Sequence, residues 1–340
     1  MERKVIEFVR TNEAKLITET VKDELEPDEV MVKTAVSTVS PGTERAVITF
    51  GPNVSGYQVG VFPRRAGYSS AGTVVKVGSQ VTSVKPGDRA VVFWGKHVEY
   101  NIVKEKRVVK IEDDAIPIEE AAAVFISVFP LAAIRKCRVE IGEPVLVMGL
   151  GLLGQFAVRL LRAAGAVPVI AMDPVKERRE AALLGGADYA LDPTKEGFAE
   201  EVKQLTGGKG AAAAIEVTGF GAGLDETLDC MAKFGRVALL GCTRDSNFTI
   251  DYYQKVHKPG ITLIGAHTIA RPKEESYPGW FTERDDIESV LKLLSMKRLS
   301  FKTLIESGNT FSPAECGSVY QSVISDRTFP PLAQFDWRRL

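Results

Sequence analysis

The spacing of three glycines after a short apolar run, Val145–Met148, predicts chemistry most directly. Gly149, Gly151 and Gly154 fit the pattern G-x-G-x-x-G, and a helical pattern over Leu152–Ala164 begins inside it. In a strand–turn–helix unit, the first glycine allows a tight turn, the second lets a pyrophosphate approach the backbone, and the third lets the helix pack closely on the strand. The helix N-terminus adds free N–H groups and a partial positive charge. The turn therefore predicts a nucleotide-binding site.

An acidic residue follows this turn where a dinucleotide site needs one. A second apolar segment, Val167–Met172, ends in Asp173, and a carboxylate at this distance accepts the ribose hydroxyls of a dinucleotide. Its charge would repel a 2′-phosphate, so the pattern favours NAD over NADP. A strand–helix turn that binds no ligand is the alternative. The residues expected to hold the pyrophosphate are Gly149, Gly151, Leu152, Leu153 and Gly154.

Composition restricts the classes of function. The 340 residues are 45% hydrophobic and 26% charged, which is ordinary for a chain long enough to form two domains. A formal net charge of −1 argues against a nucleic-acid partner or a membrane-surface role. No long apolar run is present, and Met1–Lys4 leads into a strand pattern rather than a signal peptide. The four cysteines are scattered, with no Cys-x-x-Cys pair, which suits a cytoplasmic location.

The elements that must position these residues change character near residue 118. Before about residue 115, short β-branched segments alternate with Pro and Gly turns, which predicts a compact, barrel-like antiparallel domain. After it, apolar strands alternate with helices, which predicts a doubly wound parallel sheet. We expect, among others, a helix at Leu224–Phe234, strands at Val237–Leu240 and Ile261–Gly265, and a helix at Asp285–Ser295.

The order of these patterns predicts a discontinuous domain. The final short apolar segments are expected to return to the first domain. Residues 1–125 and 266–340 would then form the catalytic domain, and residues 126–265 an inserted dinucleotide-binding domain. The cleft between two such domains is the default place for a site.

Several motifs together resemble the medium-chain dehydrogenase/reductase superfamily, the alcohol dehydrogenase-like enzymes. They are Gly72–Gly78 with Val84–Arg89, the glycine-rich turn with Asp173, and Glu216–Gly219 followed by Gly235–Gly241. The resemblance implies an α/β fold in which a doubly wound parallel Rossmann sheet is inserted in a GroES-like β-barrel catalytic domain. It also implies a nicotinamide cofactor and a homodimer or higher homo-oligomer, often joined through the last sheet strand, here Ile261–Gly265.

The sequence departs from the zinc-dependent members of this superfamily. Where they place a cysteine turn and a Gly-His-Glu turn, this chain has Ser40–Glu44 and Gly67–Ser69. Hydroxyls are poor zinc ligands at neutral pH, and Val124–Ser127, where the third ligand would stand, carries no thiol, imidazole or carboxylate. A four-cysteine zinc lobe is also missing. We therefore expect no metal and a zinc-independent branch, similar to the one that contains bacteriochlorophyllide hydroxyethyl dehydrogenase.

Without zinc, another group must exchange the substrate's proton. Tyr68 stands in the slot of the histidine ligand and is the first candidate, since cations such as Arg64, Arg65 and Lys96 would lower its pKa. A purely space-filling role for Tyr68 is the alternative. The other catalytic candidates are Ser40, Thr43, Glu44 and His267. Glu44 could be a base, or it could have a structural role at a helix start or in a salt bridge, and His267 could be structural.

The resemblance adds further cofactor residues. Arg178 matches a position beside the adenosine ribose, although a solvated helix face would also explain it. The residues that match strand ends bordering the nicotinamide are Thr218, Leu240, Gly241 and Cys242. Cys242 lacks a neighbouring base, so packing or backbone contact is expected of it. The polar and aromatic segment Arg271–Phe281 is either a lid or an ordinary interdomain or dimer loop.

These expectations define the function predicted from sequence. It is an NAD-dependent, zinc-independent oxidoreductase that interconverts a secondary alcohol and a ketone, with a polyol, cyclitol or sugar-like small molecule as substrate. The charged candidates Arg64, Arg65, Lys96 and Glu44 motivate a polar substrate. An NAD(P)H-dependent enone or quinone reductase is one alternative. A non-catalytic nicotinamide-binding redox sensor is the other.

Overall fold

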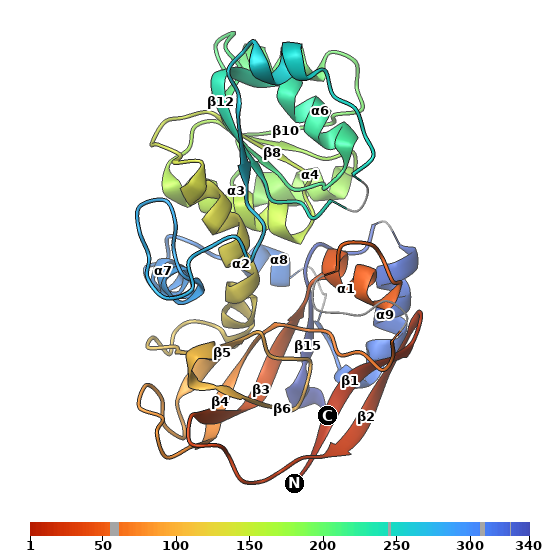
Figure 1. Ribbon diagram of the computed structural model, residues 1–340, viewed down its shortest axis with the longest axis vertical. Helices are drawn as coiled ribbons and strands as arrows, with labels where there is room; N and C mark the ends of the chain where they lie inside the picture. The colour runs from red at the N-terminus through yellow and green to blue at the C-terminus, as the bar shows by residue number, and fades with distance from the viewer. Residues whose placement is uncertain (55–60, 244–245, 307–309, 327) are drawn as a thin grey trace. The chain divides into compact units, whose positions relative to one another are not determined.

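The chain forms two compact units. The computed structural model describes residues 1–54, 61–243, 246–306, 310–326 and 328–340. One unit contains Met1–Ile126 and Ile287–Leu340, and the other contains Ser127–Asp286 (Figure 1). Residues 266–286, which the sequence-based division places with the first domain, lie in the second unit. No helix in the described part of the chain is long and apolar enough to cross a membrane.

The first unit is built on β-strands. The hairpin of β1 (Glu2–Arg10) and β2 (Glu13–Thr20) is antiparallel. In the described residues, a larger sheet has the order β14-β15-β3-β4-β5-β7, with β6 added to β3, and all its pairs except β14 with β15 are antiparallel. Its strands are β3 (Glu29–Val39), β4 (Ser69–Val77), β5 (Arg89–Phe93), β6 (Tyr100–Lys104), β7 (Val108–Lys110), β14 (Thr310–Phe311) and β15 (Ala333–Asp336). The C-terminal segment therefore returns to this sheet, as expected.

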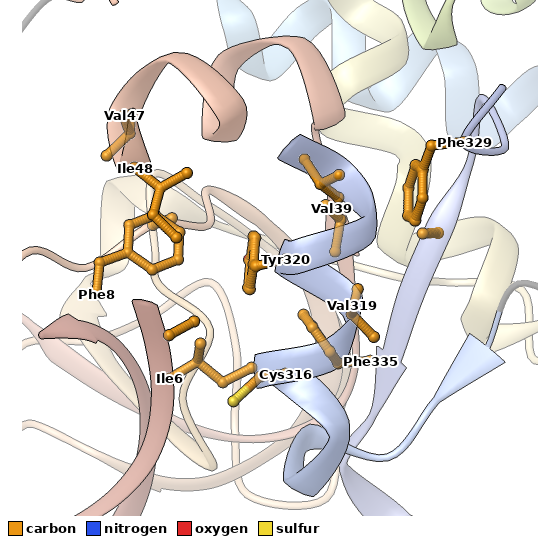
Figure 2. Packing of buried hydrophobic residues seen from close by; sticks show 14 of the residues in the cluster. Ile6, Phe8, Val39, Val47, Ile48, Cys316, Val319, Tyr320, Phe329 and Phe335 are labelled. Carbon is orange, nitrogen blue, oxygen red and sulfur yellow. The ribbon is translucent and has the colours of Figure 1, made fainter. Parts of the chain in front are cut away.

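Two apolar clusters stabilise the first unit, and the long strand β3 contributes to both. Val30 and Val32 pack in one cluster, whereas Val39 packs in the other. The second cluster brings β1 together with α9 (Cys316–Ser325), and Figure 2 shows Tyr320 projecting from α9 among its neighbours. The rings of Phe8 and Tyr320 meet edge to face at 4.7 Å. Each fully buried large side chain contributes roughly 2–3 kcal/mol.

The second unit is a doubly wound parallel sheet. In the described residues its order is β10-β9-β8-β11-β12-β13, with every pair parallel. The strands are β8 (Val145–Met148), β9 (Val169–Met172), β10 (Tyr189–Leu191), β11 (Ala211–Glu216), β12 (Met231–Leu239) and β13 (Thr262–Gly265). The helices within it are α3 (Leu152–Ala164), α4 (Lys176–Leu184), α5 (Phe198–Leu205) and α6 (Gly221–Asp229). The predicted α/β fold class is confirmed.

Successive side chains of the central strand β8 point to opposite faces of the sheet, and those on both faces are buried. Leu146 and Met148 of β8 pack in a cluster with Val202 of α5 and Leu228 of α6. The intervening side chain of Val147 points to the opposite face, and it is also buried. A strand buried on both faces reads as a continuous apolar run, which is why the sequence shows no polar alternation here.

Two sequence predictions near β12 are wrong. The helix predicted over Leu224–Phe234 ends at Asp229, and β12 begins earlier than predicted, at Met231. Met231 joins the parallel ladder opposite Ala211 and the chain then bends, with Phe234 at φ +63°. Tertiary pairing with β11 therefore overrides the helical propensity of the Met231-Ala232-Lys233 stretch.

Besides α9, further helices lie before or after these strands in the described chain. They are α1 (Pro41–Ile48), α2 (Ile118–Lys136) and α7 (Glu283–Ser295), and the short helix α8 (Lys302–Ile305) lies in the returning segment. Helix α2 begins where the sequence pattern changes, at residue 118. Most of its residues are buried.

The segment after β13 is held to the end of α2 by cations. Lys136 Nζ donates to the carbonyl groups of Gly265 and Ala270 and lies 4.5 Å from the ring centre of Trp280. Arg135 lies over the Phe281 ring at 3.6 Å. These contacts explain why residues 266–286 cluster with the second unit.

Candidate functional site

Two positions of the glycine-rich turn require glycine. Gly149 has φ +94°, in the left-handed region. A Cβ at position 154 would lie 1.9 Å from Gly149 O, so the helix α3 could not approach the turn with any larger residue. A Cβ at Gly151 would meet nothing within 4 Å. Gly151 is the N-cap of α3 and has no side chain to occupy the first N–H groups of the helix. The turn thus presents open space and free donors together, which suits an anion such as a pyrophosphate.

Parallel register brings the other predicted cofactor residues to the same edge of the sheet. Met148, the last residue of β8, pairs with Met172 of β9 and with Glu216 of β11. Glu216 in turn pairs with Leu239 of β12. The segments that follow these strand ends therefore lie side by side. They contain Gly149, Asp173, Thr218, Leu240, Gly241 and Cys242.

Asp173 is buried and ties the turn to the end of β9. One carboxylate oxygen accepts the Leu150 N–H at 2.8 Å, and the other accepts the Val175 N–H at 2.8 Å. Arg178 Nη1 lies 3.7 Å from the first of these oxygens. Each oxygen has a second lone pair, so the carboxylate can still accept a ribose hydroxyl. Arg178 is thus adjacent to the predicted ribose position.

Glu216 orders the neighbouring turn, a role the sequence prediction missed. Its Oε1 accepts the backbone N–H groups of Thr218 and Gly219 and the Thr218 hydroxyl. A Cβ on Gly149 would lie 2.9 Å from the Thr218 methyl group, so the two turns are in close contact. Burial raises the pKa of Glu216. The sequence signal that could have predicted this role is that Glu216 is the only acidic residue of the apolar strand β11 and stands at its end.

The segment after β12 packs against this second turn. The backbone N–H groups of Leu240 and Gly241 both donate to Glu216 O. A Cβ at position 241 would lie 2.3 Å from Gly219 N, which requires glycine there. Cys242 is half-buried, and its carbonyl oxygen would lie 2.6 Å from a Cβ on Gly219. These contacts are made by backbone groups.

The predicted catalytic residues of the first unit gather at the start of α1. Ser40 is the N-cap of α1 and Pro41 occupies the first helical position. The hydroxyl of Tyr68 is hydrogen-bonded to the side chains of Ser40 and Thr43. We call Ser40, Thr43 and Tyr68 the hydroxyl cluster. Thr43 is exposed, whereas Ser40 is buried, so the cluster reaches from the interior to solvent.

Glu44 lies beside this cluster and is fully engaged by donors. Its side chain accepts the Ser40 N–H at 2.9 Å and the Tyr320 hydroxyl at 2.5 Å, and it lies 3.2 Å from His97 Nε2. The residue is 1% exposed. Of the two roles predicted for Glu44, these contacts favour the one at the helix start, because the carboxylate closes the first turn of α1.

The predicted effect of nearby cations on Tyr68 is wrong. The pKa of Tyr68 is raised to about 12, because burial disfavours the phenolate and the Glu44 carboxylate adds to this, against the lowering effect of the bonds from Ser40 and Thr43. Arg65 pairs instead with Glu7 and Glu19. Tyr68 is therefore a neutral phenol at physiological pH.

Two other cations named from sequence are also engaged elsewhere. Arg64 is buried, donates to Val61 O and Val47 O, and has its guanidinium 4.3 Å from the ring centre of Phe50. Lys96 donates to Arg65 O, and burial lowers its pKa. The contacts of Arg64 and Lys96 therefore do not support the polar substrate that these charges suggested.

An aromatic wall borders Tyr68. The Tyr68 ring lies 5.7 Å from that of Trp94 and 6.1 Å from that of Phe125. Trp94 has φ +55°, which is unusual for a bulky residue. Its N–H donates to Tyr68 O, so the strained turn after β5 is paired to the start of β4. The hydroxyl cluster thus has polar groups beside an aromatic surface.

His267 lies in the second unit, apart in sequence from the cluster. It follows β13, is exposed, and its Nδ1 accepts the Ile269 N–H at 3.3 Å. The nearby Arg271 is instead buried and pairs with Asp286, which Arg135 also contacts at 3.1 Å. The segment Arg271–Phe281, for which the sequence left a lid and an ordinary loop open, is therefore attached to its own unit through its ends.

The donor chemistry does not fit the zinc site of the superfamily. Among the described residues, no group of three or more His, Cys, Asp and Glu side chains could hold a metal ion. At the two turns where ligands are expected, Ser40 and Tyr68 offer hydroxyls, which are weak zinc ligands. The nearest carboxylate, Glu44, already accepts the donors described above. We therefore derive no chemical step through a metal.

Comparison with known proteins identifies both parts of the chain. A model described as alcohol dehydrogenase GroES-like domain matches residues 26–113, and one described as zinc-binding dehydrogenase matches residues 153–283. D-guloside 3-dehydrogenase of Escherichia coli K12 is 28% identical over 260 residues, which cover 76% of this chain and 73% of that protein. L-threonine 3-dehydrogenase of Caldanaerobacter subterraneus subsp. tengcongensis is 28% identical over 294 residues, covering 78% and 82%.

The fold agrees with this. The crystal structure of galactitol-1-phosphate dehydrogenase from Escherichia coli has a TM-score of 0.83 and 20% identity, and the match covers 98% of this chain and 99% of that one. The parallel sheet of the second unit carries the dinucleotide turn, and the antiparallel sheet of the first carries the hydroxyl cluster. The chain belongs to the medium-chain, alcohol dehydrogenase-like superfamily of NAD(P)-dependent oxidoreductases.

Proposed function

We propose that this enzyme interconverts a secondary alcohol and a ketone with NAD and without zinc. The observation that carries the proposal is the hydroxyl cluster: Tyr68 hydrogen-bonds Ser40 and Thr43 where metal-dependent relatives would hold ligands. The bound nicotinamide would supply or accept the hydride. The protein must then donate or accept one proton at the substrate oxygen, and a phenol with this environment can do so.

The proton path follows from burial and exposure. In ketone reduction, the neutral Tyr68 phenol donates its proton to the developing alkoxide. Thr43, which is hydrogen-bonded to Tyr68 and exposed, can return a proton from solvent. Alcohol oxidation runs the same steps in reverse. Because its pKa is raised to about 12, Tyr68 keeps its proton at neutral pH. It can therefore act as the acid in ketone reduction.

The cofactor preference rests on Asp173. Its carboxylate lies at the strand end next to the glycine-rich turn, where a 2′-phosphate would meet its negative charge. We therefore propose NAD as the preferred cofactor, with Arg178 beside the same ribose. Gly149, Gly151 and Gly154 would hold the pyrophosphate.

The substrate class is a polyol, cyclitol or sugar-like alcohol. The similar proteins named above are dehydrogenases of a guloside, of threonine and of galactitol 1-phosphate, and two of these three molecules are polyol or sugar derivatives. The hydroxyl cluster lies beside Trp94 and Phe125, and aromatic rings next to hydrogen-bonding groups suit molecules with both C–H faces and hydroxyls.

A homodimer is proposed through β13. Within the described residues this edge strand pairs only with β12, and Leu263 at its centre is 37% exposed. An unpaired edge can add a strand of a second copy. The Ala266 N–H bonds Leu239 O of β12, so by alternation the Leu263 N–H faces the free edge. Sedimentation analysis should show a dimer for the natural chain and a monomer for Leu263→Pro, which removes this edge donor.

The test of the main proposal is turnover of a panel of polyols, cyclitols and sugars with NAD, on protein treated with a chelator. Activity should persist without metal, and Tyr68→Phe should lower kcat roughly 10²- to 10⁴-fold, the usual contribution of general acid–base catalysis. Tyr100→Phe is the matched control. Activity that is lost on chelation and restored by zinc, or a fully active Tyr68→Phe, would refute the proposal. Turnover of enones with NADPH alone would point to a reductase.

A further inference from the structure

His97 is a fully buried titratable group that the proposed mechanism does not use. Its side chain is fully buried, and each ring nitrogen has a partner. Nδ1 lies 2.8 Å from Ser37 Oγ, and Nε2 lies 3.2 Å from Glu44 Oε2. A buried imidazole held at both nitrogens has one orientation, so each ring nitrogen faces a known partner.

The partners at the two ends of this group fix which atom donates there. The indole Nε1–H of Trp337 donates to Ser37 Oγ at 2.9 Å, because an indole N–H can only donate. The Ser37 hydroxyl is in turn bonded to His97 Nδ1. His97 Nε2 must carry a proton and donate it to Glu44, since an ionised carboxylate only accepts. A chain of bonds therefore connects Trp337 to Glu44 and ends in a donor on His97 Nε2.

This chain of hydrogen bonds reaches the hydroxyl cluster by two routes. Glu44 also holds the Ser40 N–H, and Ser40 and Thr43 hold the Tyr68 hydroxyl. On the other side, His97 N donates to Ala66 O, and a Cβ on Gly67 would lie 2.7 Å from the imidazole ring. Gly67 has φ +88° and directly precedes Tyr68. His97 thus contacts both the turn that bonds the Tyr68 hydroxyl and the backbone that carries Tyr68.

We propose that His97 is a positioning residue, which holds Glu44 through its Nε2–H donor and thereby aligns Ser40 and Thr43 with Tyr68. It touches neither substrate nor cofactor and acts through Glu44. The inference rests on the proposed function only in taking Tyr68 as the proton donor. The C-terminal segment takes part, because Tyr320 of α9 donates to the same carboxylate and Trp337 begins the chain of bonds.

Two substitutions separate the hydrogen bond from the volume of the side chain. His97→Gln keeps an N–H donor near the position of Nε2, whereas His97→Leu removes it. His97→Leu should lower kcat roughly 10- to 100-fold, the range that one hydrogen bond to a charged group represents, with the KM for NAD within twofold. His97→Gln should keep at least about a third of kcat. His257→Leu, at an exposed histidine of the second unit, is the control and should match the natural enzyme.

A double-mutant cycle shows whether His97 acts through Tyr68. If it does, His97→Leu should have no further effect on kcat in the Tyr68→Phe background. Equal losses in the Gln and Leu variants, or additive losses in the cycle, would overturn the inference.

A readout that needs no turnover separates this inference from the proposed function. In a ¹⁵N–¹H correlation spectrum of histidine-labelled protein, the resonances absent from His97→Gln should be those of a ring that carries a proton on Nε2. A ring with its proton on Nδ1 alone would refute the inference, whatever the activity. If Tyr68→Phe were fully active, the proposed donor would fail, while the assignment of His97 would still be decided by its spectrum.

Discussion

Replacing Gly154 with alanine should damage the fold and the cofactor site together. A Cβ at this position would lie 1.9 Å from Gly149 O and 2.9 Å from Gly149 C, and neither atom belongs to a side chain that could rotate away. The start of α3 or the turn must therefore move by about 1 Å before the contact becomes tolerable. Overpacking of this kind costs about 1–3 kcal/mol, which corresponds to a decrease in Tm of about 3–10 °C.

Gly151→Ala is the matched comparison, because the structure predicts an unchanged stability and a weaker affinity for NAD. Its Cβ would meet nothing within 4 Å, and its φ of −67° suits alanine. The free energy of unfolding should be unchanged or increased by up to about 1 kcal/mol. The added methyl group would occupy the space assigned to the pyrophosphate, so the Kd for NAD should rise at least about tenfold, or about 1.4 kcal/mol.

Thermal unfolding with and without NAD measures both effects, since a ligand that binds the folded state raises Tm by mass action. Gly154→Ala should start from a lower Tm, and Gly151→Ala should start from the natural Tm but lose the increase on adding NAD. A natural Kd for Gly151→Ala would refute the assignment of this turn to the pyrophosphate. A natural Tm for Gly154→Ala would refute the packing argument.

Three further outcomes are expected. Asp173→Asn should lower the kcat/KM ratio of NAD to NADP at least about tenfold, because the charge that opposes a 2′-phosphate is removed beside Arg178; steady-state kinetics with both cofactors measure it, and an unchanged ratio would contradict it. Asp286→Ala should lower the free energy of unfolding in urea by about 3–5 kcal/mol, because buried Arg271 loses its counter-ion; a change below 1 kcal/mol would show that the ion pair is dispensable. Between pH 10 and 12 the unfolded chain loses the phenol proton that folded Tyr68 keeps, so alkaline stability should fall more in the natural protein than in Tyr68→Phe, by on the order of 2 kcal/mol; parallel pH curves would refute the raised pKa.

Local patterns were sufficient wherever one physical requirement acts on neighbouring residues. The strand before the glycine-rich turn and the helix after it have the predicted bounds, Val145–Met148 and Leu152–Ala164. A buried strand, a turn that only glycine can adopt and an amphipathic helix each leave a signal within a few residues. The prediction failed at Met231, where a parallel partner 20 residues earlier in the chain decided between helix and strand.

Charge was the property that sequence predicted least well. Arg65 and Tyr68 are close in sequence, which suggested that one lowers the pKa of the other, yet Arg65 pairs with Glu7 and Glu19 of the β1–β2 hairpin. The pKa of Tyr68 is raised instead, by its burial and by Glu44. The strength of an electrostatic interaction depends on distance and dielectric environment, and neither can be read from a linear spacing.

The sequence by itself determined the fold class and the glycine-rich turn between β8 and α3, because these depend on residue type and short-range spacing. Only the tertiary structure decided that Glu44 is buried between His97 and Tyr320, which come from segments 53 and 276 residues away in the chain. A buried carboxylate is stable only when several donors converge on it. That convergence depends on how β3, α1 and α9 pack together, and no local pattern in the sequence encodes it.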